Sequence, residues 1–392
     1  MSFCGGGARC FHALFLYTGR VERLRARRGV RAKKGRGMAD VSEGVQRVAV
    51  GMSGGVDSAV CAALLMQAGY EVVGVTCRFQ DDASADAAAA DAASVCACLG
   101  VPHVVRDCTA AFEHAVAAPF AAACGCGLTP SPCVGCNASC KLPALLQAAD
   151  ELGCQKVATG HYARIAQLTD SGRYVVKTAL DERKDQSYML ALLSQDQLAR
   201  LLLPLGGMTK VEVRIRAADW ELPVAEKPES QDLCFTTDYR AFLRERGVRD
   251  EPGPIVDGAG REVGRHEGLS NYTVGQRKGI GVAAPEPYYV VEKRVATNEL
   301  VVGFADEARI RSVHLAHANW QAFERLDAPR AASVKLRYRS RAVACIIEPE
   351  PAGGVRLALR EPQPTTAPGQ YAVLYEGATV LGGGMIQEVA SV

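Results

Sequence analysis

Ser53-Gly54-Gly55-Val56-Asp57-Ser58 is the stretch that decides the fold of the first half of this chain. It follows a short apolar run, Arg47 to Gly51, and precedes an amphipathic run, Ala59 to Ala68. This order predicts a strand, a glycine turn and a helix. Two adjacent glycines let the backbone turn sharply and approach a ligand closely. The free N–H groups and the positive dipole end of the next helix favour a bound phosphate.

The other residues of this loop narrow the class of nucleotide site. Ser53 and Ser58 add hydroxyl donors, and Asp57 can organise the turn or hold a magnesium ion. No lysine follows the glycines, so the loop is not the G-x-x-x-x-G-K-[ST] motif of common ATPases and GTPases. The string S-G-G-x-D-S instead resembles the pyrophosphatase loop of enzymes that cleave ATP to AMP and pyrophosphate. A tight turn without a ligand is the alternative interpretation.

Apolar strands alternate with Ala-rich helical stretches around this loop. Such alternation predicts parallel strands with helices on both faces, and ligands bind at the carboxyl ends of such strands. We therefore expect a Rossmann-like, doubly wound parallel α/β sheet in residues 46–240, with Gly160-His161-Tyr162 in the same cleft as the loop. The further expected strands are Glu71–Cys77, Val101–Val105 and Lys156–Thr159.

The pattern changes after Tyr162. Two strand-like runs around a Thr-Asp-Ser-Gly turn, Ala163–Leu168 and Arg173–Ala179, predict a hairpin, and helical stretches follow at Ser187–Leu203 and Lys210–Glu221. Beyond Glu251 the chain is rich in Pro, Gly and β-branched residues. We expect a small β-rich central domain in residues 241–305 and a C-terminal β-barrel in residues 306–392.

Composition indicates a soluble, multidomain protein. The 392 residues are 48% hydrophobic and 22% charged, and no run approaches the ~18 apolar residues of a membrane span. The net charge of +2 means that a nucleic-acid partner must be held by local basic patches. Residues 1–45 read as a basic, disordered extension, or as a mis-assigned start before Met38. Clustered cysteines without a secretory signal predict a reducing, cytoplasmic setting.

Three cysteines stand out as chemically active candidates. Cys133 and Cys136 lie three apart in a Pro-rich segment that we expect to be a loop before a helix, Asn137–Leu152. The helix dipole would lower the pKa of a thiol there and make it a usable nucleophile. Cys234 is the third, in a charged stretch. The alternatives are small buried core residues and a zinc site, because C-x-x-C is a common zinc half-site.

Eight ordered motifs together resemble the tRNA-specific 2-thiouridylase family from about Arg47 to the C-terminus. After the loop come T-P-x-P-C-x-x-C-N, Gly160-His161-Tyr162-Ala163, Lys184-Asp185-Gln186-Ser187-Tyr188, E-K-P-E-S-Q-D-L-C-F, N-Y-T-V-G-Q-R-K-G, Val334 to Arg339, and A-P-G-Q with the late glycine triplet.

The resemblance implies a reaction and its residues. ATP with Mg²⁺ would activate the C2 oxygen of the wobble uridine as an adenylate, and sulfur would then replace that oxygen. Cys234 would carry a persulfide, delivered by a donor such as a cysteine desulfurase or a sulfur-relay protein. Cys136 would be the nucleophile that releases the sulfur and forms a transient disulfide with Cys234. The implied ATP-binding residues are Gly51, Met52, Ser53, Gly54, Gly55, Val56, Asp57, Ser58, Cys77 and Gly160.

One position departs from the family pattern. Some members have an aspartate, assigned to acid–base work, where this chain has Cys133, so that role is in doubt here. Cys133 is then an auxiliary thiol. Alternatively, Cys133, Cys136 and Cys234 ligate a [4Fe-4S] cluster whose fourth iron binds sulfide. The persulfide route is the preferred hypothesis.

The expected RNA partner is the anticodon arm of a tRNA, with the wobble base flipped into the cleft. Lys335, Arg337 and Arg339 would share one face if the segment is a strand, although a solvated strand face is the plain alternative. The resemblance implies RNA contacts at Ser131, Pro132, Cys133, His161, Lys184, Asp185, Gln186, Arg337, Tyr338 and Gln370.

Two other functions remain open from the sequence. Another ATP-pyrophosphatase enzyme, acting on a small molecule, would use the same nucleotide loop but would not need Cys136 and Cys234. A non-enzymatic, zinc-stabilised RNA-binding module would need zinc and would not cleave ATP.

Overall fold

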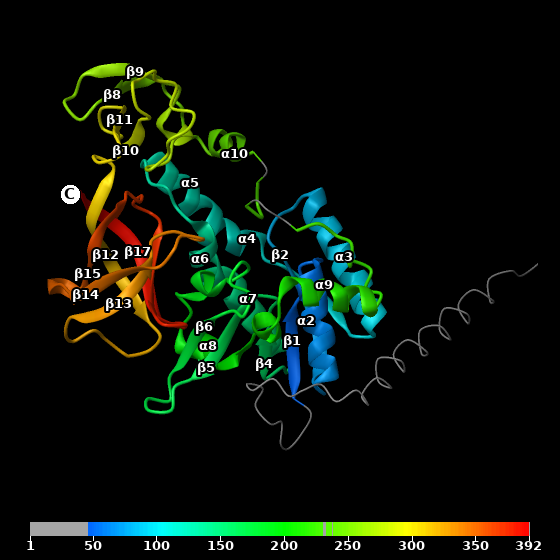
Figure 1. The fold of residues 1–392 in the computed structure, drawn as a ribbon. Coiled ribbons are helices and arrows are strands. Elements are labelled where there is room, and N and C mark those ends of the chain that lie inside the picture. The colour runs from blue at the N-terminus through cyan, green and yellow to red at the C-terminus, as the bar shows by residue number, and fades with distance from the viewer. Residues whose placement is uncertain (1–45, 230–232, 237, 392) are drawn as a thin grey trace, which may run out of the picture.

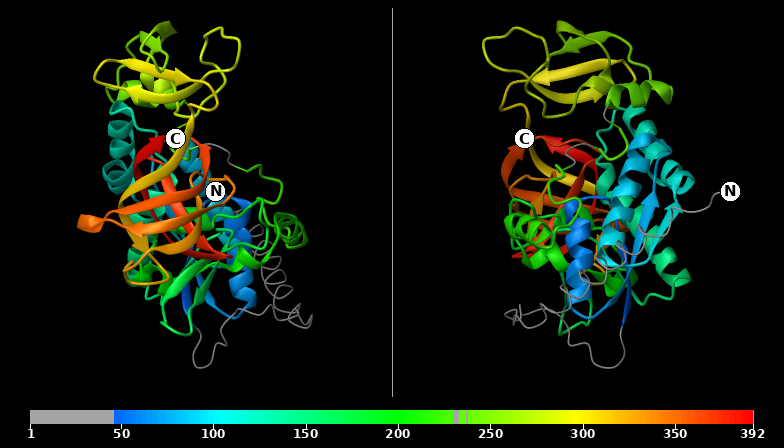
Figure 2. Two further views of the ribbon diagram at one scale, coloured as in Figure 1. Left: turned by 60° about the vertical axis from the view of Figure 1, so that its left-hand side comes forward. Right: turned by 90° about the vertical axis from the view of Figure 1, so that its right-hand side faces the viewer.

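The computed structural model describes residues 46–229, 233–236 and 238–391. The start at Met38 and the basic extension lie outside these residues. The described chain forms an α/β domain, a small central β domain and a β-barrel, as expected (Figure 1). The central domain projects from one end of the molecule, whereas the barrel lies against the α/β domain (Figure 2). Within the described residues, no helix is both long and apolar enough to cross a membrane.

The α/β domain is built on a parallel sheet in the order β3-β2-β1-β4-β7. The central strand β1 is almost fully buried, which explains its continuous apolar run. Since all five strands point the same way, their carboxyl ends meet at one edge, where the glycine loop and Gly160 lie. The strands are β1 (Arg47–Gly51), β2 (Glu71–Arg78), β3 (His103–Asp107), β4 (Lys156–Ala158) and β7 (Leu201–Leu202).

Helices cover both faces of this sheet and form two hydrophobic cores. On one face Val48 and Val50 pack with α2 (Val56–Gln67), α3 (Ala83–Leu99) and α9 (Lys210–Asp219). On the other face Ala49 packs with α7 (Leu142–Glu151) and with barrel residues such as Val373. The barrel therefore shares a core with the α/β domain, which fixes it beside the sheet. Shorter helices are α4 (Thr109–Phe112), α5 (Ala118–Gly125), α6 (Pro132–Cys136), α8 (Gln195–Arg200) and α10 (Tyr239–Glu245), with π-helices η2 (Glu113–Ala117) and η3 (Asn137–Lys141).

The expected helix over Ser187–Leu203 is wrong. The segment divides into a 3-10 helix η4 (Ser187–Leu190), helix α8 and strand β7. Ser194 begins α8 with a capping box to Gln197, and strand β7 pairs with β4. Pairing with the sheet edge satisfies backbone groups that a helix would otherwise satisfy, so tertiary context overrides local helical preference.

The central domain is a four-stranded sheet in the order β10-β11-β8-β9, with Ile255, Val290 and Leu300 in its core. A 3-10 helix η6 (Leu269–Asn271) lies in the segment between β9 and β10. The strands are β8 (Gly253–Val256), β9 (Glu262–His266), β10 (Tyr289–Arg294) and β11 (Glu299–Gly303).

The C-terminal strands close into a barrel because β12 pairs with both β15 and β17. The expected hairpin is confirmed as β5 (Ala163–Gln167) and β6 (Tyr174–Thr178). Although its sequence lies within the α/β domain, the hairpin pairs with β17 and extends the barrel sheet. The barrel strands are β12 (Arg309–Trp320), β13 (Arg330–Lys335), β14 (Val343–Pro349), β15 (Val355–Pro364), β16 (Tyr371–Glu376) and β17 (Thr379–Ser391). The 3-10 helices η5 (Pro204–Gly207) and η7 (Pro351–Gly353) complete the described elements.

Candidate nucleotide and cysteine site

The glycine loop forms the tight strand-to-helix turn that its sequence predicts. Gly54 has φ +70°, and a Cβ atom at this position would lie 2.4 Å from the carbonyl oxygen of Ala88 in α3. Both the left-handed backbone and the close approach require glycine. Gly55 is the N-cap of α2 and makes no side-chain cap, so the first N–H groups of the helix are available to a ligand.

Hydroxyl groups hold the loop in shape. The backbone N–H of Ser53 donates to Oγ of Ser58 at 3.2 Å, and that hydroxyl donates to the carbonyl of Gly55 at 2.9 Å. The two serine hydroxyls also lie 3.2 Å apart. Ser58 is buried, whereas Ser53 is exposed. Ser58 therefore stabilises the turn, and Ser53 is the hydroxyl that a ligand reaches more easily.

Two lysines from distant segments, Lys210 and Lys227, approach the loop, and the sequence analysis predicted neither contact. Lys210 Nζ lies 2.6 Å from Oδ1 of Asp57, which also accepts from the hydroxyl of Tyr162 at 2.8 Å. Lys227 Nζ donates to the carbonyl of Gly54 at 3.0 Å. These contacts span 153 and 173 residues, so no local pattern reports them. The cation absent from the loop itself is thus supplied by the fold.

Glu229 links Lys210 to a third lysine, Lys184. Its carboxylate contacts Lys184 Nζ at 2.6 Å and Lys210 Nζ at 3.1 Å. The hydrogen bond from Lys184, with that from Lys210, lowers the pKa of Glu229 to about 2. The network links the segment before Cys234 to the nucleotide loop. Lys184 was expected to contact RNA; in the structure it forms an ion pair with Glu229.

The end of β4 meets the loop as expected. A Cβ atom on Gly160 would lie 2.9 Å from the carbonyl carbon of Asp57 and 3.0 Å from the nitrogen of Ser58. His161 follows at once, and its Nδ1 lies 2.8 Å from Oγ1 of Thr159. Burial, with a smaller effect of Lys141, lowers the pKa of His161 to about 4. The imidazole is therefore neutral at physiological pH and lies close enough to Lys141, which follows Cys140 in η3, to sense its charge.

The two-cysteine segment differs from its expected form. It is not a loop before a helix, because α6 begins at Pro132 and continues through the π-helix η3 into α7. Cys133 lies in the first turn and is half-buried, while Cys136 closes α6 and is 4% exposed. π-helical turns are rare and often occur at functional sites. Here the π-helix begins directly after Cys136 and contains Cys140, another buried thiol.

The expected lowering of the thiol pKa values is also wrong for this conformation. Burial raises the pKa of Cys133 despite the nearby Lys141. The hydrogen bond to Cys140, together with burial, raises the pKa of Cys136. The same hydrogen bond lowers the pKa of Cys140. Cys136 is thus held as a thiol, and its activation needs a change at the site.

Cys234 lies close enough to the continuous helix α6–η3–α7, called the cysteine helix below, to affect the pKa of Lys141 in it. Burial lowers the pKa of Lys141, but four sulfur atoms raise it, and the net shift is upward. Cys234 is exposed, whereas Cys133 is half-buried and Cys136 and Cys140 are buried. No disulfide joins them in the structure. The four sulfurs belong to Cys133, Cys136, Cys140 and Cys234.

The barrel contacts the start of the cysteine helix. The side chain of Gln370 donates to the carbonyl of Thr129 at 2.6 Å, and the N–H of Ser131 donates to the carbonyl of Gly369 at 3.3 Å. The tertiary structure therefore brings Ser131, Pro132, Cys133 and Gln370, four of the expected RNA contacts, to one place.

The basic segment of the barrel does not form the expected strand face. Strand β13 ends at Lys335, and Arg339 has φ +65° in the following turn. Arg337 points inward and donates to the carbonyls of Val274 at 2.9 Å and Thr365 at 2.7 Å. Burial lowers its pKa. Because the strand stops, alternation cannot place the three cations together, and Arg337 connects the barrel to the central domain.

Two other expected RNA contacts are tied into the protein. The carboxylate of Asp185 accepts from the N–H of Ala179 at 3.1 Å and from the hydroxyl of Ser187 at 2.9 Å, and it lies 3.2 Å from Lys335 Nζ. Oε1 of Gln186 accepts from the N–H of Tyr162 at 2.9 Å. Both side chains therefore stabilise the fold around the site. Tyr338 is half-buried, with its ring centroid 5.9 Å from that of Tyr188 and 5.4 Å from the guanidinium of Arg339.

Comparison with known proteins agrees with this arrangement. Family profiles match along the chain: the tRNA methyl transferase HUP domain at residues 46–238, the tRNA methyl transferase PRC-barrel domain at residues 240–304, and the aminomethyltransferase beta-barrel domain at residues 310–386. The tRNA-specific 2-thiouridylase MnmA of Trichormus variabilis is 43% identical over 88% of this chain and 100% of its own length. The chain belongs to the tRNA-specific 2-thiouridylase family.

Other members of this thiouridylase family are similarly related. The MnmA protein of Chloroflexus aurantiacus is 46% identical, covering 86% of this chain and 98% of its own length. A solved structure, the U34-tRNA thiolase NcsA from Methanococcus maripaludis with its [4Fe-4S] cluster, has 17% identity and a TM-score of 0.30. It covers 58% of this chain and 69% of that one, and at this score the likeness carries no argument.

The cluster alternative does not fit the conformation of this thiouridylase-family chain. Across residues 46–229, 233–236 and 238–391, no three His, Cys, Asp or Glu side chains gather in an arrangement that would hold a metal ion. Cys133, Cys136 and Cys234 are therefore near one another without forming a ligand set.

Proposed function

We propose that this protein is a tRNA-uridine 2-sulfurtransferase that converts the wobble uridine of tRNA to 2-thiouridine. The observation that carries the proposal is the joining of two sites through Gly160 and His161. Gly160 packs on the nucleotide loop, and His161 is under the electrostatic influence of Lys141 in the cysteine helix. An enzyme that activates a carbonyl with a nucleotide and then delivers sulfur needs these two sites adjacent.

The loop and its neighbours would bind ATP. Gly54 and Gly160 let backbone segments pack closely around the loop, and the N-terminus of α2 offers free N–H groups to phosphate. Lys210 and Lys227 supply positive charge from outside the loop. Mg²⁺, when bound, would neutralise phosphate charge. If Asp57 helped to bind Mg²⁺, its ion pair with Lys210 would have to break.

The sulfur chemistry would proceed on two cysteines. The uridine C2 oxygen attacks the α-phosphorus of ATP, so that pyrophosphate leaves and an adenylate forms. Cys234 carries the sulfur as a persulfide. The thiolate of Cys136 attacks Sγ of Cys234, which forms a disulfide and expels the outer sulfur as hydrosulfide equivalent. That sulfur attacks C2, and AMP leaves with the uridine oxygen. A thiol reductant then restores both cysteines.

The anticodon arm would bind across the cysteine helix and the barrel. Ser131, Pro132, Cys133 and Gln370 lie together there, which supports them as contacts to the RNA. Exposed cations on the central domain and the barrel suit the phosphate backbone. Exposed cations of this kind include Arg277, Lys278, Arg339 and Arg341. We place the reaction in the cytoplasm, with a persulfide-bearing protein as the sulfur donor.

The test is direct synthesis of the product. Unmodified tRNA is incubated with the protein, ATP, Mg²⁺ and a persulfide donor, then digested, and nucleosides are analysed by mass spectrometry. We expect 2-thiouridine and one AMP per modified base. Cys234→Ser should remove the product, and a tRNA with cytidine at the wobble position is the matched substrate control. Absence of 2-thiouridine, or an unchanged yield with Cys234→Ser, would refute the proposal.

A further inference from the structure

Cys234 is presented by a turn whose neighbours point into the protein. The N–H of Thr236 donates to the carbonyl of Leu233 at 3.4 Å, which closes a four-residue turn with Cys234 at its second position. Phe235 is only 5% exposed and Leu233 packs against the same core, whereas Cys234 is exposed. The apolar residues on both sides therefore hold the thiol at the surface.

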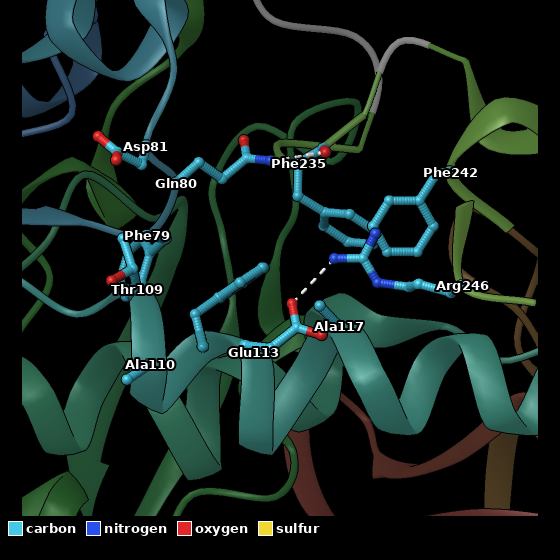
Figure 3. Close-up of a pocket in the computed structure, with 11 residues that line it drawn as sticks. Phe79, Gln80, Asp81, Thr109, Ala110, Glu113, Ala117, Phe235, Phe242 and Arg246 are labelled. Atoms are coloured by element: carbon cyan, nitrogen blue, oxygen red, sulfur yellow. Dashed lines mark hydrogen bonds and ion pairs between the residues drawn. The ribbon is translucent and has the colours of Figure 1, made fainter.

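Phe235 occupies a socket of aromatic rings. Its ring centroid lies 5.6 Å from Phe112 of α4, 5.4 Å from Phe120 of α5 and 5.0 Å from Phe242 of α10. Two of these contacts are inclined at 61° and 78°, the edge-to-face arrangement that aromatic pairs favour. Figure 3 shows Phe235 beside Phe242, above the ion pair of Glu113 and Arg246.

A hydrogen bond and a cavity complete the socket. The side-chain amide of Gln80 donates to the carbonyl of Phe235 at 2.7 Å, so the backbone of the turn is held as well as the ring (Figure 3). The adjoining cavity of about 390 Å³ is lined by Phe79, Phe112 and Phe242, among others. Phe235 itself is one of the lining residues.

The segment that carries Cys234 is thus held on both sides of the thiol. Upstream, Lys227 binds the carbonyl of Gly54, and Glu229 pairs with two lysines at the nucleotide loop. Downstream, Phe235 and Gln80 hold the turn. Fixing both ends of a segment raises the effective concentration of a group between them at a nearby partner.

We propose that Phe235 is a positioning residue whose aromatic socket holds Cys234 within reach of Cys136. This inference rests on the proposed function, in which the two thiols must meet. The ring touches neither reacting sulfur and acts through the turn. Without it, the downstream hold on Cys234 is reduced to the Gln80 hydrogen bond, and the thiol samples a larger volume.

The test measures how readily the two thiols pair. The protein is equilibrated with glutathione and glutathione disulfide, so that one disulfide oxidises the dithiol and yields two thiols. Peptide mapping by mass spectrometry quantifies the Cys136–Cys234 disulfide. The product of its ratio to the dithiol and of [GSH]²/[GSSG] is the effective concentration. We expect Phe235→Ala to lower this value roughly tenfold or more.

Matched variants separate positioning from general loosening. Phe235→Trp keeps an aromatic ring in the socket and should give a value closer to wild type than Phe235→Ala does. Phe79→Leu lies in the same cavity, with its ring 5.4 Å from Phe112, and should change the value less than twofold. Gln80→Met removes the hydrogen bond while leaving the aromatic rings intact, and should lower the value about threefold. It serves if Phe235→Ala does not fold.

Several outcomes would overturn the inference. A Phe235→Ala protein within twofold of wild type would do so, as would an equal fall with Phe79→Leu or no Cys136–Cys234 disulfide in wild type. Failure of the proposed function is distinguishable: wild type would then make no 2-thiouridine while Phe235→Ala still lowered the effective concentration. If both ideas hold, Phe235→Ala also slows single-turnover thiolation without changing the tRNA-dependent exchange of pyrophosphate into ATP.

Discussion

Gly54→Ala should lower the free energy of unfolding, because the backbone of Ala88 leaves no space for a Cβ atom at position 54. The residue has φ +70°, and its Cβ atom would meet the carbonyl oxygen of Ala88 at 2.4 Å. Gly153 is the matched control, because it has φ +67° with nothing within 4 Å of a Cβ atom. Both substitutions carry the left-handed backbone penalty, and only Gly54→Ala adds a clash with backbone.

The two penalties differ in size. The left-handed conformation costs an alanine about 1 kcal/mol relative to glycine, so Gly153→Ala should lose about that much free energy of unfolding. Overpacking against a backbone that cannot rotate away adds about 1 to 3 kcal/mol. Gly54→Ala should therefore lose about 2 to 4 kcal/mol, measured by urea unfolding followed by circular dichroism.

Function provides the second readout. Displacing Gly54 moves the loop that we assign to the ATP phosphates, so Gly54→Ala should lose most ATP-dependent AMP formation at a temperature where it remains folded. Gly153→Ala should retain wild-type turnover, since Gly153 lies at the far end of α7, away from the loop. Equal losses of stability in the two variants would refute the clash argument. Normal ATP turnover in Gly54→Ala would refute the role of the loop.

Three further outcomes are expected. Cys136→Ser and Cys234→Ser should each reduce 2-thiouridine to background, whereas adenylation of the uridine, measured as released pyrophosphate, should continue. Loss of adenylation would instead mean that the thiols serve the nucleotide site. Glu229 has its pKa lowered from 4.5 to about 2 by the Lys184 hydrogen bond, so its stabilisation is full above pH 4.5 and is lost as the pH falls toward 2. Glu229→Gln should flatten acid unfolding over that range, and an unchanged acid limb would contradict the pairing. Arg337→Met should cost about 2 kcal/mol, because it leaves two carbonyl acceptors without their donor, and should increase proteolysis between the central domain and the barrel; weaker tRNA binding with unchanged stability would instead make it an RNA contact.

The nucleotide loop was predictable because its structure is local. A buried strand, a glycine turn and a helix are each set by residues a few positions apart, and Gly54 adopts the positive φ that the turn needs. The order of the domains was equally readable, since alternation of strands and helices gives way to short strands after residue 251. Periodicity fails where pairing with a distant strand decides, as at Leu201–Leu202.

The cysteine site shows the other side of this division. The sequence identified Cys133, Cys136 and Cys234 as candidates, because thiols at such positions are chemically distinctive. It did not give their environment: the helix starts before Cys133, and burial raises rather than lowers its pKa. A pKa depends on burial and on charges from every direction, and these are set only when the chain has packed.

The sequence by itself predicted a phosphate-binding loop at residues 53–58 and identified candidate thiols in ordered motifs. Only the tertiary structure brought Lys210 and Lys227 to that loop and packed Phe235, beside Cys234, among aromatic rings. It also turned Arg337 inward, toward the central domain. The physical reason is distance along the chain. Contacts across 100 or more residues form when shared hydrophobic cores bring segments together, and no local period encodes them.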